Sequence, residues 1–208
     1  MFLGQVMQIK AILWDYGNVL VDWSPRHLYG QIITDPQKLD YFLEHVCTMK
    51  WHGLHDAGAI SMRDNINRTQ KLYPEFHDEI AVWQSRFGEM IKGSIDETIA
   101  MVEHFHQKAV PQFVLTNMPE EVVDTCFDPY NIRHKFNDII VSGIEKMAKP
   151  GADIFYLSLK RMEKYSPQEV LFIDDSLPNI ETAAKLGFIT HHYKNDGTLS
   201  QIINEIGL

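Results

Sequence analysis

Polar side chains that could perform chemistry follow several short apolar runs of this 208-residue chain. They are Asp15 after residues 11–14, Thr116 and Asn117 after residues 113–115, Lys149 in the loop after residues 139–141, and Asp174 and Asp175 after residues 170–173. Adjacent carboxylates repel each other, and a third carboxylate nearby increases the repulsion. A hard cation removes that repulsion, and oxygen ligands without a Cys/His set favour Mg²⁺. The three aspartates therefore predict a Mg²⁺ site.

Asp15 could also act as a nucleophile. An aspartate can accept a phosphoryl group as an aspartyl-phosphate. The residues Gly17 and Asn18 that follow it allow a tight loop whose N–H groups turn inward as a nest for an anion. Phosphoryl transfer requires mainly positioning and charge neutralisation. Mg²⁺, the loop lysine and the donors of Thr116 and Asn117 would supply both.

Several of these residues have plainer alternatives. Lys149 precedes Pro150 at the start of the next predicted helix, and its ammonium could enter the cleft. Lys146 is a nearby competitor, and either lysine could instead be solvated. Asn179, one helical turn beyond Asp175, could orient an acidic ligand or be an exposed first-turn residue. The aspartates themselves could be a turn residue and helix caps.

The elements that must position these residues have the pattern of a doubly wound α/β sheet. Short apolar runs that end at polar or glycine residues are typical of buried parallel strands. The predicted strands are residues 11–14, 113–115, 139–141, 170–173 and 188–190, and the predicted helices between them are residues 119–127, 152–164 and 178–186. Ligands of such sheets bind beyond the carboxyl ends of the strands, where the polar residues lie.

The first two predicted strands are separated by far more residues than a crossover needs. Apolar residues at helical spacing indicate helices within this gap. The two stripes are Leu39, Phe42, Leu43 and Val46, and Ile80, Trp83, Phe87 and Ile91; Ser61 with Asp64 predicts a capped helix start between them. We expect a helical cap at residues 24–93, which would cover the site as a lid, and a core formed by residues 1–23 and 94–208.

Composition excludes several classes of protein. The net charge of −9 argues against a nucleic-acid binder. Two cysteines, Cys47 and Cys126, fit a reducing compartment and give no disulfide framework. No apolar run has the roughly 18 to 20 residues that span a bilayer, and Met1–Met7 lacks the features of a secretory signal. We therefore expect a cytoplasmic protein without a membrane partner; the sequence does not predict an oligomeric state.

The sequence resembles the haloacid dehalogenase superfamily of hydrolases, because four motifs occur in the same order. They are Asp15-Tyr16-Gly17-Asn18-Val19-Leu20, then Leu115-Thr116-Asn117, then Lys149-Pro150, and finally Ile173-Asp174-Asp175 with Asn179. The segment between the first two motifs resembles the family's small α-helical cap. Sugar-phosphate phosphatases of the superfamily have a similar Asp-x-Gly-Asn first motif.

The resemblance implies a role for each matching residue. Asp15 would be the nucleophile, and Mg²⁺ would be bound by Asp15, the Gly17 carbonyl and Asp175, with Asp174 assisting. The transferred phosphoryl group would be held by Thr116, Asn117 and Lys149, with Gly17 and Asn18 in the loop beside it.

One position departs from the family. Phosphatases of this family usually carry a second aspartate two residues after the nucleophile, as general acid and base, and this chain has Gly17 there. General acid–base catalysis contributes roughly 10²- to 10⁴-fold. Three explanations remain: a good leaving group such as that of a sugar 1-phosphate, a proton from another residue, or slow or absent turnover. The candidate proton donors are Asp22, His52, His55 and Asp56.

Histidines and a tryptophan in the predicted cap are candidates for substrate specificity. Trp51 could stack on a sugar ring, and His52 and His55 could form a specificity patch or a second metal site, although all three could be ordinary core residues. The pairs His104/His106 and His191/His192 are expected to be structural.

These observations predict a Mg²⁺-dependent phosphomonoester hydrolase that acts on a small phosphorylated metabolite, such as a sugar 1-phosphate. One alternative is a 2-haloacid dehalogenase, whose chemistry needs no Mg²⁺ and would leave the paired aspartates unexplained. A phosphosugar mutase is disfavoured by Gly17. The alternative that is not an enzyme is a phosphate-binding or regulatory protein without catalytic activity.

Overall fold

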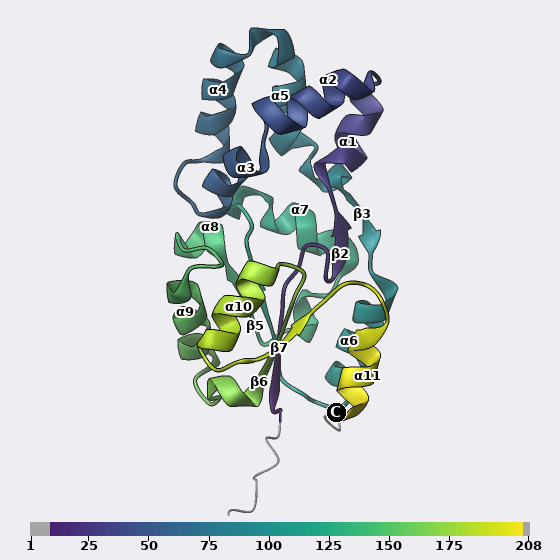
Figure 1. Cartoon of the computed structure of the whole chain (residues 1–208), viewed down its shortest axis with the longest axis vertical. Helices are drawn as coiled ribbons and strands as arrows, with labels where there is room; N and C mark the ends of the chain where they lie inside the picture. The colour runs from purple at the N-terminus through teal and green to yellow at the C-terminus, as the bar shows by residue number, and fades with distance from the viewer. Residues whose placement is uncertain (1–8, 206–208) are drawn as a thin grey trace, which may run out of the picture.

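The core of the computed structural model, which describes residues 9–205, is a five-stranded parallel sheet (Figure 1). Its strands, in spatial order, are β5 (Asp138–Val141), β4 (Gln112–Thr116), β1 (Ala11–Trp14), β6 (Val170–Asp174) and β7 (Ile189–His192). The five predicted strands are confirmed, the last of them displaced by one or two residues. The predicted α/β class is confirmed as well. Met1–Met7 lies outside the described residues.

Helices cover both faces of the sheet, because side chains of the central strand alternate between two apolar cores. Ile12 and Trp14 of β1 belong to one core, together with residues of α6 (Asp96–Gln107) and α11 (Thr198–Glu205). Ala11 and Leu13 belong to the other, with residues of α9 (Ala152–Met162) and α10 (Leu177–Lys185). Figure 1 shows these two helix pairs on opposite sides of the strands. The sheet is therefore doubly wound, as predicted.

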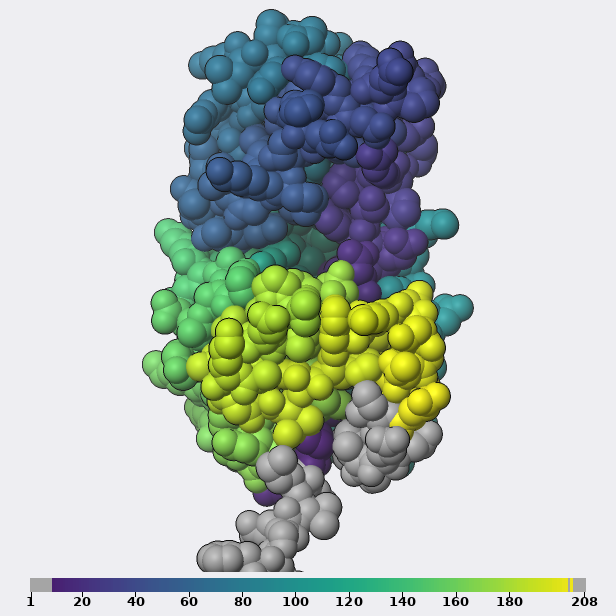
Figure 2. Space-filling model, in the orientation of Figure 1, coloured from purple at the N-terminus to yellow at the C-terminus, as the bar shows by residue number. Residues whose placement is uncertain are grey.

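A helical segment stands over the carboxyl edge of the sheet (Figures 1 and 2). Its elements are α1 (Pro25–Ile32), α2 (Pro36–Tyr41), a π-helix (Phe42–Val46), α3 (Met49–Asp56), α4 (Met62–Leu72), a 3₁₀ turn (Pro74–Phe76) and α5 (His77–Ser85). Ser61 caps α4, since its side chain accepts a hydrogen bond from the Asp64 N–H at 3.1 Å. The predicted helical cap is present, while the limits 24–93 stay a prediction.

An antiparallel ribbon, which the sequence patterns did not reveal, joins this segment to the core. It pairs β2 (Val21–Trp23) with β3 (Ile91–Ser94). The apolar stripe that begins at Ile80 predicted helix as far as Ile91, and this was wrong. The α5 helix ends at Ser85 and a 3₁₀ turn spans Phe87–Met90. The chain then becomes extended, because Ile91 pairs with β2 and the ribbon uses its backbone groups.

Short elements complete the path of the chain outside the sheet. They are a 3₁₀ turn (Glu120–Val122), α7 (Val123–Phe127), 3₁₀ turns at Asp128–Tyr130 and Arg133–Lys135, α8 (Ser142–Glu145) and a 3₁₀ turn at Pro167–Glu169. Among residues 9–205, no helix combines the length and the apolar content that crossing a bilayer would require.

Candidate active site

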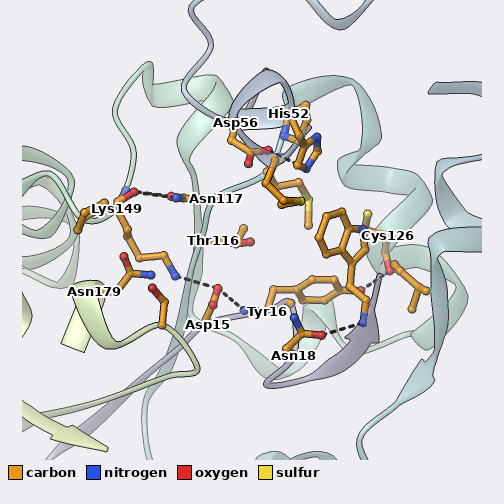
Figure 3. A pocket seen from close by; sticks show the side chains of 18 of the residues that line it. Asp15, Tyr16, Asn18, His52, Asp56, Thr116, Asn117, Cys126, Lys149 and Asn179 are labelled. Atoms are coloured by element: carbon orange, nitrogen blue, oxygen red, sulfur yellow. Dashed lines mark hydrogen bonds and ion pairs between the residues drawn. The ribbon is translucent and has the colours of Figure 1, made fainter. Parts of the chain in front are cut away.

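The order of the strands brings the predicted site residues together at one edge of the sheet. β1 lies between β4 and β6, so Asp15, directly after β1, is flanked by Thr116 at the end of β4 and Asp174 at the end of β6. The Asp15 N–H donates to the Ile173 carbonyl of β6 at 2.8 Å, which extends the ladder by one residue. Figure 3 shows Asp15 and Thr116 below a chamber whose upper wall contains His52 and Asp56.

Lys149 is the cation of this cluster. Its buried ammonium contacts Asp15 Oδ1 at 2.8 Å and Asp174 Oδ2 at 2.6 Å, and it donates to the Leu115 carbonyl at 2.8 Å. Burial opposes the charge, but both carboxylates favour it, and the pKa of Lys149 is raised. The competitor Lys146 is exposed at the end of α8. The structure thus brings Lys149, and not Lys146, to the site.

The Asn117 side chain holds the backbone of Lys149. Its Oδ1 accepts from the Lys149 N–H at 2.9 Å, and its Nδ2 donates to the Lys149 carbonyl at 2.8 Å. Asn117 follows β4 directly, so this pair of bonds fixes the lysine loop to the sheet. The sequence motif gave no sign of this bracing role, since it predicted only a contact with phosphate.

Asp174 is fully buried and densely hydrogen-bonded. Its oxygens accept from Asn179 Nδ2 at 3.0 Å each and from the Ser176 N–H at 2.8 Å, in addition to the Lys149 ion pair. Asn179 is itself buried, so the alternative of an exposed first-turn residue is wrong. These contacts orient the Asp174 carboxylate on the side of Lys149.

Three carboxylates share a small volume at this edge. One ligand oxygen from each of Asp15, Asp174 and Asp175 lies within 4.8 Å of the other two. Burial and the neighbouring carboxylates raise the pKa of Asp15, although the charge of Lys149 opposes this shift. Burial and the Asp174 charge also raise the pKa of Asp175. One ammonium does not balance three carboxylates, and the oxygen-only donor set fits Mg²⁺.

The loop after Asp15 is less open than the predicted anion nest. The Tyr16 N–H donates to Asp15 Oδ1 at 2.7 Å, and the Asn18 N–H donates to the Val21 carbonyl at 2.7 Å. Asn18 Oδ1 also accepts from the Trp23 N–H at 3.1 Å. Two of the N–H groups are therefore used inside the protein, and Asn18 closes the turn at positive φ.

A chamber of about 410 Å³ lies between the strand ends and the cap. We call its strand-end side the floor, formed by Asp15, Thr116, Asn117, Lys149 and Asn179, with the buried Asp174 beneath. We call its cap side the roof, formed by Trp23, Met49, His52, Asp56, Phe87 and Ile91. Tyr16, Met118 and Cys126 add side walls. The chamber is thus polar at the floor and mainly apolar elsewhere.

Only part of the predicted cap patch faces the chamber. His52 lines it and stacks on Trp23, with ring centroids 5.2 Å apart. Trp51 and His55 are absent from the chamber wall and pack inside the cap. The Trp51 Nε1 donates to Thr69 Oγ1 at 2.7 Å, and the ring packs edge-on against Trp83.

His55 is also committed to the cap interior, where its Nε2 contacts Asn65 Nδ2 at 2.8 Å. In residues 9–205, the three ligand groups that come close enough to share a metal ion are Asp15, Asp174 and Asp175, not these histidines. Asp22, another candidate proton donor, pairs with His27 outside the chamber.

His192 lies nearer to the site than predicted, because its Nε2 contacts the Asp175 carbonyl at 2.9 Å. The sequence reasoning also missed the apolar roof. Trp23 and Ile91 belong to the ribbon, which had no sequence signal, and Phe87 was assigned to a helix. An apolar residue in the cap gives no local sign of whether it faces the cap interior or the chamber.

Comparison with known proteins decides the family. The sequence model of the haloacid dehalogenase-like hydrolases matches residues 9–187. The chain belongs to this family. It is therefore a hydrolase with the family's fold, and the resemblance seen in the four motifs is confirmed at the level of the family.

Among curated proteins, this hydrolase is similar to the sesquiterpene phosphatase astK of Aspergillus oryzae, with 23% identity over 183 residues that cover 88% of this chain and 89% of the relative. A solved HAD family enzyme of Bacteroides thetaiotaomicron, in complex with magnesium and inorganic phosphate, has a TM-score of 0.74 at 20% identity and covers 93% of this chain and 98% of its own.

The L-2-haloacid dehalogenase of Xanthobacter autotrophicus, solved with chloropropionic acid covalently bound, has a TM-score of 0.63 at 14% identity, over 95% of this chain and 83% of its own. At such identities the solved structures show a shared fold only.

Proposed function

We propose that this hydrolase is a Mg²⁺-dependent phosphomonoesterase that acts on a small phosphorylated metabolite. The main support for the proposal is the arrangement at the strand ends, where Lys149 bridges Asp15 and Asp174 and Asp175 completes a group of three carboxylates. Such a site combines a nucleophile, a fixed cation and an oxygen-only donor set for a divalent ion.

In the first step, Asp15 attacks phosphorus and the bond to the leaving oxygen breaks, giving an aspartyl-phosphate. Lys149 steadies the equatorial oxygens, and Thr116 donates to them. Since the Asn117 side chain holds Lys149, its own contact with phosphate would come through the backbone N–H. Bound Mg²⁺, held by Asp15, Asp175 and the Gly17 carbonyl, would neutralise charge on the phosphoryl group. In the second step, water attacks phosphorus and releases Asp15.

Two relatives support this choice of reaction. One is named as a phosphatase, and another was solved with magnesium and inorganic phosphate. A dehalogenase of the same fold remains a rival, but its chemistry gives no reason for the close approach of Asp174 and Asp175 to Asp15. The other rival, a phosphate-binding protein without turnover, would keep the same floor.

The alcohol part of the substrate must suit the roof. The sugar 1-phosphate that the sequence predicts would provide a good leaving group beside Gly17. The roof, however, presents Trp23, Phe87 and Ile91 to the chamber, and such side chains offer a sugar few hydrogen-bond partners. A phosphate ester of an apolar alcohol suits this lining better, and the curated relative is named for a sesquiterpene substrate. We therefore propose an apolar monoester as the second candidate.

A phosphate-release assay over both substrate classes tests the proposal. We expect turnover with added Mg²⁺ and its loss on chelation by EDTA, with recovery when Mg²⁺ is returned in excess. Activity that persists in EDTA would contradict the metal-dependent reaction. Release of chloride from a 2-haloacid, with no release of phosphate from any ester, would favour the dehalogenase.

A further inference from the structure

Asp56, at the end of α3, is a buried carboxyl group that the floor chemistry does not use. It lines the chamber and is about nine-tenths buried. Its Oδ1 has no hydrogen-bond partner among the described residues. His52 lies one helical turn earlier, and its Nε2 is 3.4 Å from the Asp56 Oδ1. Figure 3 shows the carboxyl group in the roof, across the chamber from Asp15.

The main chain at Asp56 is anchored to the core. The Ser142 hydroxyl at the start of α8 donates to the Asp56 carbonyl, and the Met118 N–H after β4 donates to the Ser142 oxygen at 2.9 Å. Two residues later, Gly58 has a φ of +60°, and a Cβ there would lie 2.7 Å from the Gly143 carbonyl. This close contact fixes the end of α3 against two strand-end loops, so the carboxyl group has a defined position over the floor.

The chamber has open space at Gly17, where the family's phosphatases usually carry a second aspartate. Gly17 lines the chamber, and a Cβ placed on it would meet no other atom within 4 Å. The family's usual acid would project from that position. Because nothing in this part of the chain fills the space, a substrate can extend past Gly17 toward the roof and bring its leaving oxygen near Asp56.

We propose that Asp56 is the general acid and base of this hydrolase, supplied by the cap in place of the residue absent at Gly17. The inference rests on the proposed phosphomonoesterase function. As Asp15 bonds to phosphorus and the phosphorus–oxygen ester bond breaks, the Asp56 carboxyl gives its proton to the leaving oxygen and an alcohol is released. The Asp56 carboxylate then takes a proton from the water that attacks the aspartyl-phosphate. Phosphate leaves, Asp15 is restored as a carboxylate, and Asp56 is protonated again.

The surroundings of Asp56 suit this exchange. Burial raises its pKa to about 7, against the opposing charge of Lys149, so both protonation states are accessible near neutral pH. The other titratable neighbour, His52, is neutral there, since burial lowers its pKa to about 3. Ser142 and Gly143 of α8 contact this end of α3 and carry no charge, and the exposed Lys146 at the end of α8 has its Cγ 3.2 Å from where a Cβ of Gly58 would lie. His52 therefore does not compete as a cationic acid.

The test compares leaving groups in full-length Asp56→Asn, with Mg²⁺ present. On p-nitrophenyl phosphate, whose leaving group needs little protonation, we expect kcat/KM, which reports the steps up to formation of the aspartyl-phosphate, to change by less than about tenfold. On phenethyl phosphate, an alkyl ester, we expect kcat/KM to fall by roughly 10²- to 10⁴-fold, the usual range for loss of general acid catalysis. The wild-type rate with the alkyl ester should also fall as pH rises through about 7, as the acid form is lost, and this limb should vanish in the variant.

Asp22→Asn, outside the chamber, serves as the matched control and should retain wild-type rates with both esters. A retained kcat/KM for p-nitrophenyl phosphate shows that Asp56→Asn is folded. Equal losses of kcat/KM with both esters, or no loss of kcat/KM with the alkyl ester, would overturn the role of Asp56 and leave the phosphomonoesterase intact. Absence of turnover by the wild type with either ester would overturn both proposals.

Discussion

The floor and the roof of the chamber differ in how their polar atoms are hydrogen-bonded. At the floor, Lys149, Asn117, Asn179 and Asp174 bond one another at 2.6–3.0 Å. At the roof, Trp23 Nε1, His52 Nδ1 and Asp56 Oδ1 are buried without a hydrogen-bond partner among the described residues. The polar groups of the floor are thus hydrogen-bonded to one another before any substrate arrives, whereas the roof leaves polar atoms without partners among apolar rings.

The difference follows from what each side must do. A buried ion pair is tolerated only where further hydrogen bonds compensate its desolvation, and a phosphoryl group requires fixed charges in fixed places. The alcohol of the substrate varies in shape, so its binding surface needs contact area with a few polar groups. Variants at the floor should therefore affect turnover, and variants of the apolar roof residues should affect the choice of substrate.

The largest effect is expected at the nucleophile. Asp15→Asn removes the attacking carboxylate while keeping its size, and we expect kcat to fall by about 10⁴-fold or more, as for other covalent catalysts that lose the nucleophile. Phosphate release from p-nitrophenyl phosphate measures this, and a thermal melt checks the fold. A variant that retains a tenth of wild-type kcat would remove Asp15 from the mechanism.

Lys149→Ala should affect both activity and stability. The ammonium offsets two buried carboxylates, and breaking a buried pair at one partner costs about 3–5 kcal/mol. The loss of phosphate neutralisation should also lower kcat by about 10²- to 10³-fold. Urea unfolding and kcat measure the two effects. Lys146→Ala, at an exposed lysine three residues earlier, is the control and should stay within about twofold; the reverse ranking would contradict the assignment.

Asn179→Ala should reduce stability more than it reduces activity. The amide donates to both oxygens of Asp174, and a hydrogen bond to a charged group is worth about 1.5–3 kcal/mol. We expect a loss of that size in urea unfolding. Asn67→Ala, at an exposed position of α4, should be nearly neutral. Equal stabilities for the two variants would show that Asp174 does not need this donor.

The smallest effect is expected at the roof, with Phe87→Leu. A modest change in apolar contact area alters selectivity by about 1–3 kcal/mol. We expect KM for an apolar monoester to rise about tenfold, with little change for a small polar ester such as glycerol phosphate. Phe76→Leu, buried in the cap but absent from the chamber wall, is the control. A parallel rise of KM for both esters would contradict a selective role for the roof.

The sequence determined the floor because its signals are local. Most of the polar residues directly follow an apolar run, Lys149 lies in the loop after another, and in a parallel sheet the carboxyl ends of the strands must meet at one edge. The identities of Asp15, Lys149, Asp174 and Asp175 therefore predicted the cluster before any coordinates. The sequence likewise determined that Gly17 has no proton to give.

The tertiary structure alone decided how the cap meets that edge. In α3, residues three and four apart are neighbours, so His52 lies beside both His55 and Asp56. Only the packing of Trp51 and His55 against α4 and α5 leaves His52 and Asp56 to reach the chamber. The β2–β3 ribbon was equally hidden, because it pairs segments that are far apart in the chain. The contacts that determine which residues form the roof are long-range, and no local sequence pattern predicts them.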